Sequence, residues 1–399
     1  MSPAPAAVLE LFRSRFGGVA DGVWLAPGRA NLMGEHTDYN EGYVLPFALG
    51  QGIVAAAARR TDRRLVLCSA QEPGGPADVP LDGLAPGGVA GWAAYPAGVA
   101  WALAAAGYEV PGACIAIDSD LPTGAGLSSS AALECATALA LTELAGLAID
   151  RRELAAIARR AENDFVGVPS GIMDQSASLL TRRGHALLLD CRSLDSSQVP
   201  FDPAASDAGL LLINTRASHE LTAGEYGRRR TECEQAARLL GVPSLRYLTD
   251  VAELDRLADP VLRRRARHVI TDDRRVLDVV ALLTSGLTSG LTSGLTSGDA
   301  DPYAGIGRLL TEAHVSLRDD FEISWPEADV AVAEALAAGA LGARMIGGGF
   351  GGSVLALVRA DATDAVRAAV AKAYAGRSWT APEFGAAAPS ASARRLGLE

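Results

Sequence analysis

A strand that leads through a glycine- and serine-rich turn into a long helix constrains the fold of this chain most. The apolar run 113–118 is typical of a strand, and LPTGAGLSSSAALECATALALTEL follows it as a turn and then a helix. Gly124 and Gly126 permit close backbone approach, and three serines stand where the helix begins. Free N–H groups and the helix dipole at such an end favour an anion. The alternative is a serine-capped helix that binds no ligand.

Groups of strands and groups of helices surround this unit without regular βαβ alternation. The charged run Arg59–Arg64 is expected to be the tip of a hairpin between the strands 53–59 and 65–69. The pattern predicts further strands at 23–29, 210–214, 343–346 and 354–358, and helices near the amino terminus, at 93–106, after Asp150 and at 361–374. Residues 215–338 are expected to be mostly helical. The fold class is therefore α+β, with mixed or antiparallel sheets and helices packed on them.

Length and charge limit the domain organisation and the function classes. A chain of 399 residues exceeds a typical single core, so we expect two domains. The Ser-, Asp- and Pro-rich stretch Ser193–Pro203 is the expected boundary, which gives domains 1–203 and 204–399. A formal charge of −11 disfavours a nucleic-acid partner. The amphipathic start is unlike a signal peptide, the Ala-rich runs are weak membrane spans, and cysteines and histidines lack metal-site spacing. We expect a cytoplasmic protein with no membrane partner and no transition-metal site.

A dense polar turn lies between two apolar segments, in APGRANLMGEHTDYNEGYVLP from Ala26 to Pro46. It places Arg29, Asn31, Glu35, His36 and Asp38 within ten positions. Glycines let such a backbone bend tightly, so the turn could face a ligand rich in hydroxyl groups, such as a sugar. The alternative is a solvated loop between two strands.

Two later stretches also bear on chemistry. The run IGGGFGGS formally matches a dinucleotide fingerprint, but SVLALV follows it as a strand where that fingerprint requires a helix. We therefore interpret its glycines as a tight turn between strands. In AENDFVGVPSGIMDQSAS, Glu162 ends one helix and Asp174 begins another. From the residues alone, Asp174 is either a helix cap or a general base.

Four copies of LTSG occupy Leu283 to Gly298. The period is too short for a solenoid, and a glycine at every fourth position disfavours a helix. We expect an exposed loop without a role in chemistry.

Together and in this order, these stretches resemble the galactokinases of the GHMP kinase superfamily. The family's sugar-binding motif is similar to GRANLMGEHTDYN, its phosphate loop to LPTGAGLSSSAAL and its third motif to MIGGGFGGS. GVPSGIMDQ, GEYGRRRTECEQAARLLG and SLRDDFEISWPE match as well, so the resemblance covers nearly the whole chain. It implies a two-domain GHMP kinase fold with the active site in the interdomain cleft.

The resemblance also implies a reaction and a role for each matching residue. The γ-phosphate of ATP would pass to the anomeric hydroxyl of α-D-galactose, giving α-D-galactose 1-phosphate and ADP, with Mg²⁺ as cofactor. Asp174 would be the catalytic base, with Arg29 beside it. The sugar would contact Glu35, His36, Thr37, Asp38, Gly171 and Tyr226; the triphosphate would contact Gly124, Ala125, Gly126, Leu127, Ser128, Ser129 and Ser130; and Mg²⁺ would bind Ser130 and Glu162. We expect a monomer.

Two alternatives stay open beside this reaction. One is a kinase for a related sugar such as N-acetylgalactosamine, because pocket space around the 2-position decides that preference. The other is a non-catalytic sensor of galactose and ATP, a loss associated in the family with deletions in the serine-rich loop, which is intact here. The chain departs from the family pattern at Ile346, where threonine is common, at Trp325, where cysteine is common, and in the LTSG insertion.

Overall fold

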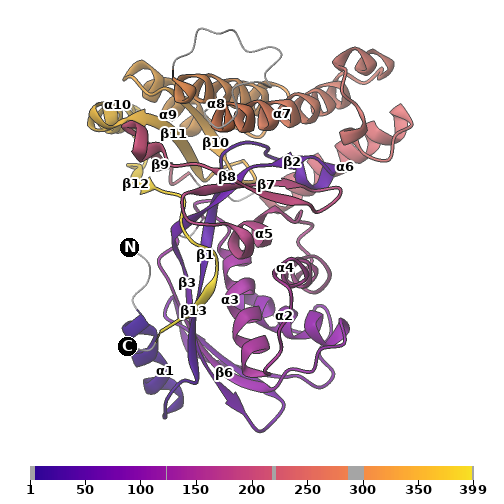
Figure 1. The fold of residues 1–399 in the computed structure, drawn as a ribbon, viewed down its shortest axis with the longest axis vertical. Coiled ribbons are helices and arrows are strands. Elements are labelled where there is room, and N and C mark those ends of the chain that lie inside the picture. The colour runs from indigo at the N-terminus through magenta and orange to yellow at the C-terminus, as the bar shows by residue number, and fades with distance from the viewer. Residues whose placement is uncertain (1–4, 123, 218–221, 286–300, 398–399) are drawn as a thin grey trace.

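The structure, a computed structural model, describes residues 5–122, 124–217, 222–285 and 301–397. Its lower part in Figure 1 is built on a six-stranded sheet, and helices lie across the top over a four-stranded sheet. The strands are β1 (Gly22–Asn31), β2 (Tyr43–Val44), β3 (Pro46–Arg60), β4 (Arg64–Ser69), β5 (Glu72–Pro80), β6 (Gly112–Ser119), β7 (His185–Asp190), β8 (Ser196–Pro200), β9 (Ala208–Asn214), β10 (Gly342–Ile346), β11 (Ser353–Arg359), β12 (Glu383–Ala387) and β13 (Arg394–Leu396). The helices are α1 (Pro5–Phe16), α2 (Ala94–Ala105), α3 (Ser129–Leu144), α4 (Arg151–Arg160), α5 (Met173–Leu180), α6 (Thr222–Leu240), α7 (Pro260–Thr284), α8 (Pro302–Asp319), α9 (Pro326–Ala337) and α10 (Thr363–Ala375).

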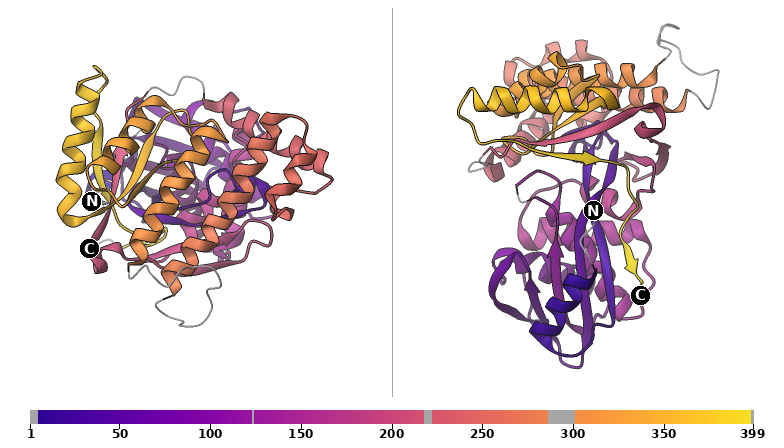
Figure 2. Two further views of the ribbon diagram at one scale, coloured as in Figure 1. Left: turned by 90° about the horizontal axis from the view of Figure 1, so that it is seen from above. Right: turned by 90° about the vertical axis from the view of Figure 1, so that its left-hand side faces the viewer.

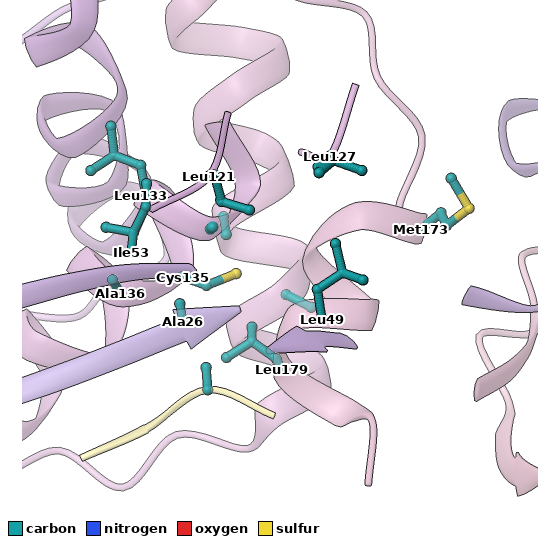
Figure 3. Packing of buried hydrophobic residues seen from close by; sticks show 14 of the residues in the cluster. Ala26, Leu49, Ile53, Leu121, Leu127, Leu133, Cys135, Ala136, Met173 and Leu179 are labelled. Carbon is teal, nitrogen blue, oxygen red and sulfur yellow. The ribbon is translucent and has the colours of Figure 1, made fainter. Parts of the chain in front are cut away.

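The six-stranded sheet runs in the order β13-β1-β3-β6-β4-β5 and carries apolar residues on both faces. Along a strand, successive side chains point to opposite faces. Val23 and Leu25 of β1 therefore pack with α1 in one cluster, whereas Trp24 and Ala26 belong to the main core. Figure 3 shows part of that core, where Ala26 and Ile53 of the sheet lie near Leu133 and Cys135 of α3. The sheet thus supports α3, whose first turn contains Ser129 and Ser130 of the serine-rich stretch.

Most of the expected elements are confirmed, although β5, β7, β8, β12 and β13 were not anticipated. Asp150 caps α4 by accepting a hydrogen bond from the backbone N–H of Arg152 at 2.9 Å. β10 and β11 pair as antiparallel neighbours through IGGGFGGS, so the rejection of a dinucleotide fingerprint is confirmed. The helix α4 is followed directly by a π-helical turn over Ala161–Val166, so Glu162 lies within this turn and does not end a helix.

The expected hairpin between 53–59 and 65–69 is wrong. β6 lies between β3 and β4, pairing antiparallel with the first and parallel with the second. The charged turn therefore passes over the start of β6, where a Cβ on Gly112 would lie 2.0 Å from the carbonyl oxygen of Asp62. A strand inserted from about fifty residues later leaves no local signal, which is why the sequence pattern suggested a hairpin.

The upper part carries a sheet in the order β10-β11-β9-β12, which Figure 2 shows edge-on beneath the helices. A three-stranded sheet, β2-β7-β8, lies between the two larger sheets in Figure 1. The stretch 193–203 contains β8, and β13 pairs with β1 in the lower sheet. The division at residue 203 stays a prediction.

Two further expectations concern the LTSG repeats and membrane-spanning helices. Of the LTSG repeats, Leu283 and Thr284 belong to α7, and the prediction for 286–298 lies outside the described residues. Among the described residues, no helix is both long enough and apolar enough to cross a membrane.

Candidate active site

A pocket of about 160 Å³ brings together side chains from both halves of the sequence. Most of the residues expected to contact the sugar line it, together with the expected base and its arginine. The lining consists of Arg29, Glu35, His36, Asp38, Glu162, Val168, Ser170, Gly171, Met173, Asp174, Tyr226, Gly347 and Gly348. Of the residues expected at the sugar and the base, only Thr37 is not among these lining residues.

An ion pair between Arg29 and Asp174 lies at this pocket. The guanidinium donates through Nε to Oδ1 at 2.8 Å and through Nη2 to Oδ2 at 3.1 Å, a bidentate geometry that fixes the carboxylate's plane. The hydroxyl of Ser128 also donates to Asp174. Asp174 lies in the first turn of α5 but does not cap it, because Ile172 is the N-cap residue. The helix-cap interpretation is therefore wrong, and the carboxylate is available to the pocket.

Arg29 connects the pocket to the expected triphosphate site, residues 124–130, which is called the phosphate loop below. Its Nη1 donates to the carbonyl of Gly126 at 2.7 Å, and its side chain is almost fully buried. Burial alone would lower the pKa of Arg29, but the charges of Asp174 and Glu35 raise it, so the guanidinium stays protonated. One side chain thus sets the distance between the expected base and the expected triphosphate site.

The polar turn between β1 and β2 is held in an unusual backbone conformation. His36 has φ +59° and Glu41 φ +60°, and Gly34 has φ +93°. The Nε2 of His36 lies 3.2 Å from the carbonyl of Gly348, so it carries the proton, and Nδ1 accepts from the hydroxyl of Tyr39 at 2.7 Å. Burial lowers the pKa of His36 to about 3, which keeps the ring neutral. The turn is therefore not a solvated loop.

Glu35 and Asp38 present carboxyl groups in different surroundings. The Glu35 side chain forms a fully buried ion pair with Arg344 of β10 at 2.9 Å and accepts from the N–H of Gly347 at 2.8 Å. Asp38 has no arginine partner within ion-pair distance among the described residues, and burial, with the nearby charge of Asp174, raises its pKa to about 6. Its carboxyl group therefore keeps acceptor capacity for a ligand.

Of the remaining expected sugar contacts, Gly171 and Tyr226 line the pocket and Thr37 does not. A Cβ on Gly171 would lie 1.8 Å from Oδ2 of Asp38, so only glycine fits there. The Tyr226 ring packs against that of His36, with centroids 4.9 Å apart. Thr37 is fully buried, and its hydroxyl donates to the carbonyl of Tyr43 at 2.7 Å, which stabilises the turn. Its role as a sugar contact stays a prediction that this geometry does not support.

The phosphate loop buries its two apolar residues. Ala125 and Leu127 are buried, and Figure 3 shows Leu127 near Leu121 in the core. The Ser353 hydroxyl donates to the carbonyl of Ala125 at 2.8 Å, which attaches the loop to β11. The backbone N–H of Ala125 donates to the carbonyl of Pro122, and the carbonyl of Leu127 accepts from the N–H of Arg29, so both residues hold the loop itself. The loop can offer a ligand the hydroxyls of Ser129 and Ser130 at the first turn of α3.

Glu162 lies close to Ser130 in a cluster of buried polar groups. Its Oε2 accepts from Ser170 Oγ at 2.7 Å and from Gln175 Nε2 at 2.8 Å. The same amide nitrogen donates to Glu134 at 3.0 Å. Burial and the charge of Asp174 raise the pKa of Glu162, while hydrogen bonds from Ser170, Ser130 and Gln175 lower it. Within the described residues it has no lysine or arginine partner, so a hard cation would suit this carboxyl group.

Sequence reasoning missed several residues of this region. A second pocket of about 220 Å³, next to Ser129 and Ser130, is lined by Trp92 and Tyr95 along with other residues. The aromatic content of AGWAAYPAGVAW gave a weak signal for it. Arg344, alone among apolar residues in GARMI, gave a stronger one, because a charge in a buried strand requires a partner.

Comparisons with known proteins agree with this arrangement. The chain matches the family profile of the galactokinase galactose-binding signature over residues 10–59, of the GHMP kinases N terminal domain over 94–182 and of the GHMP kinases C terminal domain over 301–376. It is 51% identical to a galactokinase from Streptomyces coelicolor, covering 97% of each chain. It is 46% identical to one from Mycobacterium tuberculosis, covering 90% of this chain and 97% of that one.

Solved structures share the same fold. The crystal structure of Lactococcus lactis galactokinase complexed with galactose superimposes with a TM-score of 0.90 at 33% identity, covering 98% of this chain and 99% of that one. A mevalonate kinase with 15% identity reaches a TM-score of 0.64 over 92% of this chain and 98% of its own, which shows the fold alone. The chain therefore belongs to the galactokinase family of the GHMP kinase superfamily.

Proposed function

We propose that this protein is a galactokinase, which transfers the γ-phosphoryl group of ATP to the anomeric hydroxyl of α-D-galactose. The observation that carries the proposal is the Asp174 carboxylate, held by Arg29 in the same pocket as Glu35, His36 and Asp38. Arg29 also contacts the phosphate loop, so the proposed sugar and phosphate sites adjoin. Relatives named galactokinase at 46–51% identity support the same reaction, and neither alternative has comparable support.

In the proposed mechanism Asp174 accepts the proton of the anomeric hydroxyl. The sugar oxygen then forms a bond to the γ-phosphorus as the bond from that phosphorus to the bridging oxygen of ADP breaks. Phosphoryl transfer depends on in-line positioning and on neutralised charge more than on covalent chemistry. Arg29 supplies a fixed positive charge beside the base, and the carboxyl group of Asp38 orients the sugar through its hydroxyls.

We propose that the triphosphate binds along residues 124–130 and that the nucleotide base enters the pocket between Trp92 and Tyr95. That pocket lies at the first turn of α3, where free N–H groups favour phosphate oxygens. An aromatic wall suits a planar base, because stacking buries both faces of the ring.

We propose Mg²⁺ as the cofactor, held by the Ser130 hydroxyl and the Glu162 carboxylate together with phosphate oxygens. When bound, the ion would neutralise charge that develops on the phosphates. The Glu162→Gln variant keeps the shape of the side chain and loses its charge. We expect weaker Mn²⁺ binding to the enzyme–ADP complex by electron paramagnetic resonance; unchanged Mn²⁺ binding would remove Glu162 from the site.

The reaction is tested by ADP release across a panel of sugars, with the product identified by ³¹P NMR. We expect a sugar 1-phosphate with galactose and little or no activity in Asp174→Asn. The matched control Asp164→Asn changes an exposed carboxylate and should retain normal turnover. Reaction with N-acetylgalactosamine but not galactose would overturn the proposed substrate, and galactose binding without ADP release would indicate a sensor.

Cytoplasmic location and a monomeric state stay predictions. The monomeric state can be tested by light scattering.

A further inference from the structure

The turn that carries the proposed sugar contacts, residues 34–43, is called the sugar loop below. It contains two non-glycine residues in the left-handed region, His36 and Glu41. Such conformations cost free energy and persist only where the surrounding structure holds them. The groups that hold this backbone are therefore part of what places Glu35, His36 and Asp38 in the pocket.

Three buried side chains of α7 hold both ends of the sugar loop. His268 and Asp272 lie four residues apart, so they share one face of the helix. His268 Nε2 donates to the carbonyl of Glu35 at 3.0 Å, and Asp272 Oδ2 accepts from the N–H of the same residue at 3.0 Å. At the other end, Asp273 Oδ1 accepts from the N–H of Tyr43 at 2.7 Å.

These contacts join parts of the chain that are far apart in sequence, and neighbouring side chains fix their geometry. More than 225 residues separate each side chain from its partner in the loop. Nδ1 of His268 accepts from the Ser316 hydroxyl of α8 at 3.0 Å, which fixes the ring so that Nε2 carries the proton. Phe321 packs against the rings of both His268 and His36, at 4.5 and 5.0 Å. The loop is thus attached to α7 and packs against Phe321, which follows α8 in the chain.

Two adjacent buried aspartates are costly for folding. Asp272 is fully buried and pairs with Arg275 at 2.7 Å. Burial raises the pKa of Asp273 to about 7, although the N–H of Tyr43 and the charge of Arg246 oppose this shift. Apolar side chains would fill this space at lower cost. The aspartates are therefore better explained by their hydrogen bonds to the loop than by stability.

We propose that His268, Asp272 and Asp273 are positioning residues that fix the sugar loop and so set the affinity and selectivity for the sugar. They do not touch the reacting atoms. The inference rests on the proposed function, because it takes the pocket beside the loop as the sugar site.

The test compares sugar binding with phosphoryl transfer in Asp273→Ala. Galactose affinity is measured by calorimetry without nucleotide, and kcat and the KM for ATP by steady-state kinetics. We expect galactose to bind roughly 10-fold more weakly or worse, because small misplacements of binding groups are costly. The KM for ATP and kcat at saturating galactose should change by less than about twofold. Asp273→Asn, which keeps an acceptor oxygen, should restore most of the affinity.

A second variant, chosen to destabilise the fold without touching the sugar loop, distinguishes a loss of loop positioning from a loss of stability. Leu282→Ala lies on the same helix and removes packing against Gly305 of α8. It should lower the midpoint of urea unfolding without changing galactose affinity. Equal affinities in Asp273→Ala and Leu282→Ala, or a loss of kcat at unchanged galactose affinity, would overturn the inference. If Asp273→Ala does not fold, His268→Phe, which keeps a buried ring and loses the N–H that donates to the Glu35 carbonyl, supplies the same comparison. A wild-type protein that phosphorylates another sugar would overturn the proposed substrate, and the same binding test would then use that sugar.

Discussion

The raised pKa of Asp38 predicts an acid limb in the pH profile of galactose phosphorylation. Burial and the charge of Asp174 raise the pKa of Asp38 to about 6, against the N–H groups of Tyr39 and Met173. If only the ionised carboxylate accepts hydrogen bonds from the sugar, its population sets kcat/KM. About nine tenths of the groups are ionised at pH 7 and about one tenth at pH 5, so kcat/KM should fall about tenfold.

The assay measures initial rates at low galactose and saturating MgATP between pH 5 and pH 8. Under these conditions the rate reports the free enzyme's ionisation. Asp38→Asn should be slow at every pH and should lack the limb near pH 6. A wild-type profile that is flat down to pH 5, or a limb that persists unchanged in Asp38→Asn, would refute the assignment.

The same shift predicts the opposite pH dependence for stability. Because the folded-state pKa is raised from 3.8 to about 6, the contribution of Asp38 to stability is complete below the unfolded value and is lost as the pH rises through about 6. A shift of about two units corresponds to at most ~3 kcal/mol. Relative to Asp38→Asn, the wild type should therefore lose up to that free energy of unfolding between pH 4 and pH 8. A difference that is constant with pH would contradict the raised pKa.

Three other variants test neighbouring parts of the site. Gly171→Ala would place its Cβ 1.8 Å from Oδ2 of Asp38, so the KM for galactose should rise roughly tenfold or more while the KM for ATP stays unchanged, and normal galactose kinetics would refute this. Trp92→Ala removes an aromatic wall of the second pocket, so steady-state kinetics should show a KM for ATP about tenfold higher, with galactose affinity by calorimetry as the control. Arg344→Met leaves the Glu35 carboxylate buried without its partner, so urea unfolding should show a loss of about 3–5 kcal/mol; a loss below about 1 kcal/mol would contradict a structural ion pair.

Much of the candidate site was predictable from the sequence because its residues cluster in a few short stretches. The polar turn, the serine-rich loop and the segment before Asp174 each contain several of them. The roles of Ser128 and Thr37 were harder to predict. Ser128 donates to Asp174, and Thr37 uses its hydroxyl on the loop backbone, because each side chain's direction depends on a left-handed residue at or beside its own position.

The sequence by itself determined the elements whose signals are local. The apolar strand segment in β1, the cap at Asp150 and the strand after IGGGFGGS all depend on residues close in sequence, and each expectation is confirmed. Only the tertiary structure decided which distant segments meet. In the folded chain β6 lies between β3 and β4, Arg344 pairs with Glu35, and Asp272 and Asp273 bind the backbone of the sugar loop. Hydrogen-bonding partners more than 200 residues apart leave no periodic pattern, because their pairing depends on how whole elements pack.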